Sequence, residues 1–148
     1  MTLHTIGYER LQPGPLTAEL SAAGVQRVID VRFRPQSRRP GMSKTKLGDR
    51  LGDHGMAYEH RRALGTPHEL RALFHAGRIE EGRAGYRAHL EADPDAAAAL
   101  DDLAAELRAP GAPATALLCL EADPAVCHRR VITEMLAERL GGLRVVDL

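Results

Sequence analysis

The chain has 148 residues, of which 44% are hydrophobic and 27% are charged, and its formal net charge is zero. This length suits one domain with a full hydrophobic core, and the composition excludes disordered and fibrous classes. A neutral chain also gives no global reason to expect nucleic acid or an acidic membrane as a partner. We therefore expect a single domain over residues 1–148.

The charges are nevertheless segregated along the sequence. Residues 32–46 contain six basic side chains and no acidic one, whereas residues 91–106 contain six acidic side chains and no basic one. We expect one positive and one negative region on the surface.

Cys119 and Cys127 are too few for the disulfide framework of a small secreted domain, so we expect both as reduced thiols. The first ten residues lack the features of a signal peptide, and no stretch is long and apolar enough to cross a bilayer. The sequence thus predicts a cytoplasmic protein with no membrane partner.

In chain order, the apolar run at residues 3–8 predicts a first strand. Residues 17–23 predict a helix that Gly24 ends, and the β-branched run at 25–31 predicts a buried strand. A basic, proline-containing loop follows over residues 32–42.

Ser43 is placed to cap a helix that ends near His54, and residues 56–60 predict a third, short strand. Glycines interrupt the region from Pro67 to Gly85, where we predict a helix over residues 68–77 only.

Residues 94–109 predict a helix, because proline suits a first turn, alanine favours helix and leucines recur at helical spacing. The continuous apolar run at 115–121 predicts a strand covered on both faces. Asp123 and Pro124 predict the start of a long helix that reaches about Leu140, and residues 143–148 predict a last strand.

Strands that alternate with helices indicate an α/β fold. We expect a single-domain three-layer sandwich, in which a mainly parallel sheet of about five strands carries helices on both faces. Ligands of such sheets bind beyond the carboxyl ends of the strands, where loops and helix N-termini converge. The predicted strand ends carry Tyr8, Asp30 with Arg32 and Arg34, and Glu121, so we expect these groups in one cleft.

The start of the last predicted helix brings further chemistry to this cleft. With about 100° of rotation per residue, His128 lies on the apolar side, Arg129 at its edge, and Cys127 points away unless the first turn is distorted. A helix N-terminus also favours anions and lowers the pKa of a nearby histidine or cysteine. We therefore expect His128 to face the sheet close to Glu121.

Two interpretations of this group stay open. Glu121 and His128 suit an acid/base pair, with Arg129 and Cys127 as further catalytic candidates. Alternatively, Glu121, His128 and Arg129 form a structural network that holds the last helix to the sheet. The sequence argues against the Cys-x5-Arg nucleophile of phosphatases, because neither cysteine is followed by arginine at that spacing. Cys119 lies within an apolar run, so we expect it in the core.

The chain has no H-E-x-x-H motif and no C-x-x-C pair, so we predict no metal, although a single site that uses Glu121, Cys127 or His128 stays open. It also lacks a Walker lysine loop and a G-x-G-x-x-G turn, so no particular cofactor is predicted.

The basic loop has the charge and the donors for phosphate binding. The partner that we expect is a small anionic ligand or a nucleotide. Nucleic acid is the alternative, although three tyrosines, two phenylalanines and no tryptophan offer few stacking partners. The ligand-binding residues expected on this basis are Tyr8, Asp30, Arg32, Arg34, Ser37 and Arg38.

Much of the chain resembles a bacterial and archaeal family called domain of unknown function 488. The resemblance rests on residues 5–10, 23–47, 56–65 and 117–136. The family's Cys-x-Glu and Cys-His-Arg motifs correspond to Cys119, Glu121, Cys127, His128 and Arg129, and its Asp-x-Arg to Asp30 and Arg32, followed by Pro35, Ser37 and Arg38. The resemblance implies an α/β fold and no particular reaction.

From the residues we expect an enzyme that binds a phosphate- or nucleotide-containing ligand, with Glu121 and His128 as acid and base. The alternative is a binding module for nucleic acid or a nucleotide, in which Glu121, His128 and Arg129 are structural.

Overall fold

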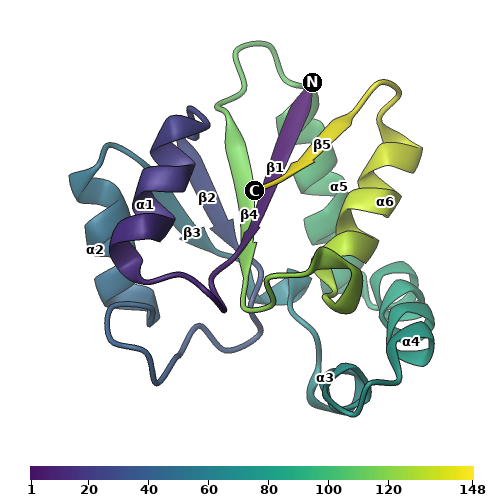
Figure 1. Cartoon of the computed structure of the whole chain (residues 1–148). Coiled ribbons are helices and arrows are strands. Elements are labelled where there is room, and N and C mark those ends of the chain that lie inside the picture. Colours follow the sequence, from purple (N-terminus) through teal and green to yellow (C-terminus); the bar gives the residue numbers. More distant parts are fainter.

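A computed structural model describes all 148 residues and contains one sheet of five parallel strands in the order β3-β2-β4-β1-β5 (Figure 1). The strands are β1 (Thr2–Gly7), β2 (Arg27–Asp30), β3 (Ala57–His60), β4 (Thr115–Cys119) and β5 (Arg144–Asp147). The helices are α1 (Pro13–Ala22), α2 (Lys44–Asp53), α3 (His68–His75), α4 (Ile79–Ala92), α5 (Pro94–Arg108) and α6 (Arg129–Arg139), with 3₁₀ turns η1 (Arg62–Leu64) and η2 (Pro124–Val126).

Helices cover both faces of the sheet, which confirms the predicted three-layer α/β sandwich (Figure 1). Alternate residues of each strand point to opposite faces. On one face Ala116 and Leu118 of β4 pack in the cluster that includes Leu16 of α1 and Leu47 of α2. On the other face Leu117 of β4 packs with residues of α4, α5 and α6.

The strand order opens a crevice at the carboxyl ends of β1 and β4. These two strands are neighbours in the middle of the sheet. After β1 the chain continues through α1 to β2, on the side of the β3 edge, whereas after β4 it continues through α6 to β5 at the other edge. Because the connections leave in opposite directions, their loops leave a gap above the strand ends, as in other open parallel sheets.

The last helix begins later than predicted. Asp123 and Pro124 start η2, and the Asp123 carboxylate accepts a hydrogen bond from the backbone N–H of Ala125 at 2.9 Å. Cys127 is extended, with φ −125° and ψ 145°, and α6 begins only at Arg129. The distorted first turn that the prediction allowed for is therefore present, and the Cys127 side chain is buried instead of pointing away from the core.

Two other helices differ from the prediction. α1 begins at Pro13 rather than at Thr17, because its prolines suit the first turn. α4 was not predicted, since Gly82 and Gly85 break the helical pattern. Close packing against α3 explains both glycines: a Cβ at Gly85 would lie 2.6 Å from a methyl carbon of Leu70. None of the helices combines the length and the apolar character that a bilayer crossing requires.

Candidate functional site

A pocket of about 370 Å³ lies beyond the carboxyl ends of β1, β2 and β4. We call it the strand-end pocket. Its lining comes from the segments that follow these three strands, from the residues before α6, and from α3. The structure thus brings most of the predicted site residues to one cavity: Tyr8, Arg32, Arg34, Ser37, Arg38, Glu121, Cys127 and His128.

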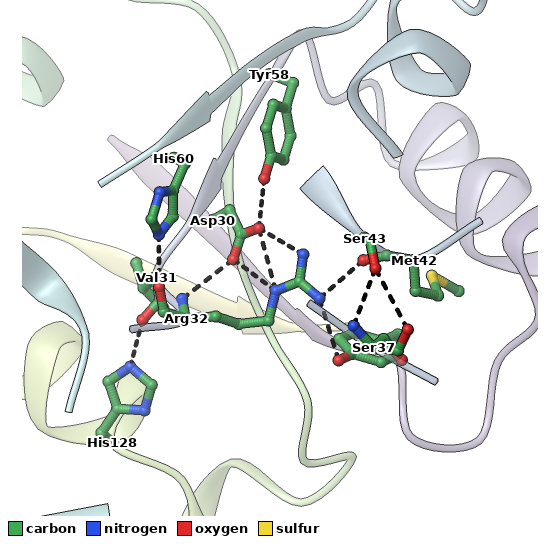
Figure 2. A network of polar contacts seen from close by, with 10 residues as sticks. Asp30, Val31, Arg32, Ser37, Met42, Ser43, Tyr58, His60 and His128 are labelled. Carbon is green, nitrogen blue, oxygen red and sulfur yellow. Dashed lines mark hydrogen bonds and ion pairs between the residues drawn. The ribbon is translucent and has the colours of Figure 1, made fainter. Parts of the chain in front are cut away.

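Asp30 and Arg32 form a buried ion pair (Figure 2), and Arg32 is also part of the pocket lining. Arg32 donates from Nη2 to Asp30 at 2.7 Å and from Nη1 to the Tyr8 hydroxyl at 3.1 Å and the Met42 carbonyl at 2.8 Å. Burial lowers the pKa of Arg32, but the bond to Asp30 outweighs it and leaves that pKa raised. With these bonds made, Arg32 has little capacity left for a ligand.

The hydroxyl of Tyr58 completes this pair, because it donates to Asp30 at 2.5 Å (Figure 2). Burial, and then the bond to Asp30, raise the pKa of Tyr58. Asp30 itself has no exposed surface. It therefore supports the pocket from below and has no surface through which it could touch a ligand directly.

Internal bonds shape the basic loop. The Ser43 hydroxyl accepts a hydrogen bond from the backbone N–H of Ser37 at 3.0 Å (Figure 2). It makes no capping hydrogen bond to the first turn of α2, so the predicted capping role was wrong. The Arg39 guanidinium donates to the carbonyls of Tyr8, Glu9 and Leu11. Arg39 thus ties the loop to the segment after β1.

Exposed guanidiniums surround the mouth of the pocket. Arg34 and Arg38 come from the basic loop, and Arg71 comes from α3. Their guanidiniums form no hydrogen bond or ion pair with other residues. Glu121 is the one acidic residue in the lining, against these arginines and Arg32, so the pocket carries a positive formal charge.

Cys119, Cys127 and His128 form a compact group on the pocket floor, which we call the thiol–imidazole cluster. His128 donates from Nε2 to the carbonyl of Val31 at 2.8 Å (Figure 2), so a neutral ring presents the lone pair of Nδ1. This Nδ1 lies 3.7 Å from the sulfur of Cys119 and 3.7 Å from that of Cys127. The sheet thereby orients the imidazole toward both thiols.

The three groups of this cluster shift one another's pKa values. Burial raises the pKa of Cys127, but the bond with Cys119 and the charge of His128 outweigh it, so this pKa lies well below its usual range. Burial lowers the pKa of His128, but Cys127 raises it above normal. The bond with Cys127, followed by burial, raises the pKa of Cys119.

Glu121 lines the same pocket as this cluster and contacts it. Its Oε2 accepts a hydrogen bond from the Cys119 thiol at 3.3 Å. Burial and the negative charge of Cys127 raise the pKa of Glu121 to about 7. Glu121 and His128 lie in the same pocket but do not bond each other directly, because Nδ1 faces the sulfurs.

Arg129 does not line the pocket. Its guanidinium is fully buried and donates to Thr5 Oγ1 at 3.2 Å and to the carbonyls of Glu121 and Ala122 at 2.5 and 3.2 Å. It therefore fixes the backbone turn that carries Glu121. Gly7 also allows this turn, because the backbone at Glu121 packs directly against it. A Cβ at position 7 would lie 1.7 Å from the Glu121 carbonyl oxygen.

Several lining residues were not predicted from the sequence. Arg71, Phe74 and His75 come from α3, and Thr66 from the loop before it. The α3 helix itself was predicted, but no local pattern tells which part of the sheet it covers. A phenylalanine and two basic side chains on one short helix were a weak signal for a binding wall.

Comparison with known families gives one result. A family model described as Domain of unknown function DUF488 matches residues 15–136. No curated protein and no solved structure matches the chain significantly. The matched range contains every pocket-lining segment except Tyr8.

Proposed function

The chain belongs to the DUF488 family, whose description names no reaction, and from its pocket we propose an enzyme that binds a small phosphate- or nucleotide-containing anion. One observation carries the proposal: Arg34, Arg38 and Arg71, without protein partners, surround the same cavity that holds Glu121. The three arginines would bind the anionic group, and Glu121 would move a proton.

The charge and size of the pocket support an anionic ligand. Guanidinium groups bind phosphate through paired hydrogen bonds, and free guanidiniums are available for such bonds without first breaking an internal contact. A volume of about 370 Å³ is at the small end for ligand pockets, which commonly measure about 300 to 1,000 Å³. The pocket therefore suits a mononucleotide or a smaller phosphate ester.

Aromatic side chains support a ligand with a flat ring. Phe33 and Phe74 line the pocket, and the Arg62 guanidinium lies 4.2 Å from the centre of the Phe33 ring. Stacking on such rings tolerates any base. A nucleobase could therefore lie against these walls while its phosphate meets the arginines.

Glu121 suits the role of general acid or base, since it is the acidic group of the lining and lies in the segment that follows β4. His128 has a different role in this proposal. Because its Nε2 bonds Val31 and its Nδ1 faces sulfur, it is a positioning residue for the cysteines rather than the partner of Glu121.

Calorimetric titration with AMP, adenosine and inorganic phosphate tests the binding. We expect AMP to bind more tightly than adenosine, and Arg38→Ala and Arg71→Ala each to weaken AMP binding about tenfold or more, the value of a charge-assisted hydrogen bond. Arg144→Ala is the control, because this exposed arginine lies at the start of β5, away from the pocket. Equal affinity in the three variants, or no binding of AMP and phosphate, would contradict the proposal.

A nucleic-acid ligand is the second candidate, and a neighbouring groove favours it. This groove of about 470 Å³ belongs to the same basic loop and is lined by Arg39, Lys44 and Lys46 among others. If a nucleic-acid strand binds in this groove, the affinity for single-stranded RNA should fall steeply as the salt concentration rises. The affinity should also fall in a Lys44→Ala, Lys46→Ala double variant. If the double variant binds AMP with unchanged affinity, this result favours the enzyme with a small anionic ligand.

A further inference from the structure

We propose that Cys119, Cys127 and His128 form a binding site for one thiolate-preferring metal ion, Zn²⁺ in the first instance. The ligand atoms of these three residues all lie within 4.8 Å of one another. They come from the end of β4 and from the segment before α6, so the fold itself brings them together. The site does not depend on the proposed anion binding.

The spacing of the donor atoms fits a tetrahedral ion. With Zn–S bonds of about 2.3 Å and a Zn–N bond of about 2.0 Å, neighbouring sulfur and nitrogen ligands lie about 3.5 Å apart. The distances from Nδ1 of His128 to the two sulfurs are both 3.7 Å. The two sulfurs lie within 4.8 Å of each other, whereas two sulfurs bound to one tetrahedral ion lie about 3.7 Å apart. Binding of an ion would therefore bring the two cysteine side chains closer by up to about 1 Å.

The orientation of His128 matches that of a metal ligand. Metal-binding histidines usually donate their second ring N–H to a carbonyl or carboxylate, which fixes the ring and its tautomer. Here Nε2 donates to the Val31 carbonyl at 2.8 Å (Figure 2). Tyr86 packs edge-on against the same ring at 5.2 Å. The lone pair of Nδ1 is thus held toward the sulfurs.

The contacts within the cluster are weak hydrogen bonds. His128 Nδ1 lies 3.7 Å from each sulfur, and the Cys119 sulfur lies 3.3 Å from Glu121 Oε2. Sulfur is a weak hydrogen-bond partner, so these contacts would be replaced at little cost. A metal ion would use a lone pair from each of the three groups.

The fourth coordination position would face the strand-end pocket, which all three residues line. Glu121 lies on that side, 3.3 Å from the Cys119 sulfur. Three protein ligands with one open position are typical of catalytic rather than structural zinc sites. If the proposed function holds, the open position would receive the anion or a water molecule beside Glu121.

The test titrates Co²⁺ and Zn²⁺ into the full chain, kept reduced with a phosphine and checked by intact mass for free thiols. We expect one equivalent of Co²⁺ to give a thiolate charge-transfer band in the near ultraviolet, which Zn²⁺ removes. Cys119→Ser, Cys127→Ser and His128→Gln should each weaken metal binding at least a hundredfold, with circular dichroism as a check on folding.

His60→Gln is the matched control, because His60 also bonds a backbone carbonyl, that of Arg32 at 2.7 Å, but lies outside the cluster (Figure 2). It should bind metal as the unchanged protein does. Absence of the charge-transfer band in the reduced, unchanged protein would overturn the site, and so would equal affinity in His128→Gln. Neither result would affect AMP binding measured in metal-free protein, so the two proposals fail separately.

Discussion

Asp30 is fully buried, and both of its carboxylate oxygens accept hydrogen bonds from Arg32, with Tyr58 as a further donor. A buried carboxylate is tolerated only when it is paired and fully hydrogen-bonded. The Asp-x-Arg motif therefore forms a buried structural pair at the carboxyl end of β2, whereas the guanidiniums of Arg34, Arg38 and Arg71 stay exposed around the pocket.

Arg32→Met should destabilise the protein by about 3–5 kcal/mol, because it leaves the Asp30 charge buried without its cation. Urea denaturation at neutral pH measures this as a lower free energy of unfolding. Arg34→Met provides the comparison, since this exposed guanidinium has no partner and its loss should change stability by less than about 0.5 kcal/mol. Similar values for the two variants would show that the pair is not structural.

The sequence held a signal for this pairing. Side chains at positions i and i+2 of an extended segment share a face, so Asp30 and Arg32 could have been expected to meet. What the sequence could not provide is their burial, to which Tyr8, in the segment after β1, and Tyr58 of β3 contribute. Cys119 differs in this respect: it was expected in the core, and it packs there, but only the fold reveals its contact with His128.

At the scale of elements, α6 shows why helix starts are hard to predict. Asp123 and Pro124 are good starting residues, and they do start a helical turn, but of the 3₁₀ type. The chain then runs extended through Cys127, which places its thiol inward. Arg129 stabilises this path, because its guanidinium donates to the carbonyls of Glu121 and Ala122. Such a long-range requirement leaves no local pattern.

Arg129→Met should loosen the segment between β4 and α6 while α6 itself persists. Removing the guanidinium leaves two carbonyls and the Thr5 hydroxyl without their donor, which costs about 1–3 kcal/mol for each group left unsatisfied. Hydrogen–deuterium exchange should therefore rise over residues 120–128. Arg130→Met is the control, because its side chain only meets Asp147, at 3.3 Å. Unchanged exchange in Arg129→Met would contradict this role.

For the whole molecule, alternation of strands and helices was enough to predict the layers and the parallel sheet. The strand order and the position of α3 over the pocket depend on packing between distant segments, which the sequence pattern does not encode. The expected negative region is also partly neutralised by such packing. Within residues 91–106, Asp101 pairs with Arg139, and Glu106 pairs with Arg27 and Arg61.

Glu106 connects α5 to the sheet, since its Oε2 accepts from Arg27 at 2.7 Å and from Arg61 at 2.8 Å. Burial raises the pKa of Glu106, but the bonds to Arg61 and Arg27 outweigh it and leave this pKa below its usual value. A carboxyl with a lowered pKa in the folded state stabilises the protein above its unfolded pKa, and this contribution is lost as the pH falls.

Glu106→Gln should therefore lower the melting temperature at pH 7, and the difference from the unchanged protein should shrink as the pH falls below the unfolded pKa of glutamate and through the lowered pKa of Glu106. Thermal unfolding followed by circular dichroism at several pH values measures this difference. Glu80→Gln is the control, because Glu80 is exposed and pairs with no cation, so its effect should be small at every pH. If Glu106→Gln lowers the melting temperature by the same amount at pH 7 and at the lowest pH measured, packing rather than charge joins α5 to the sheet.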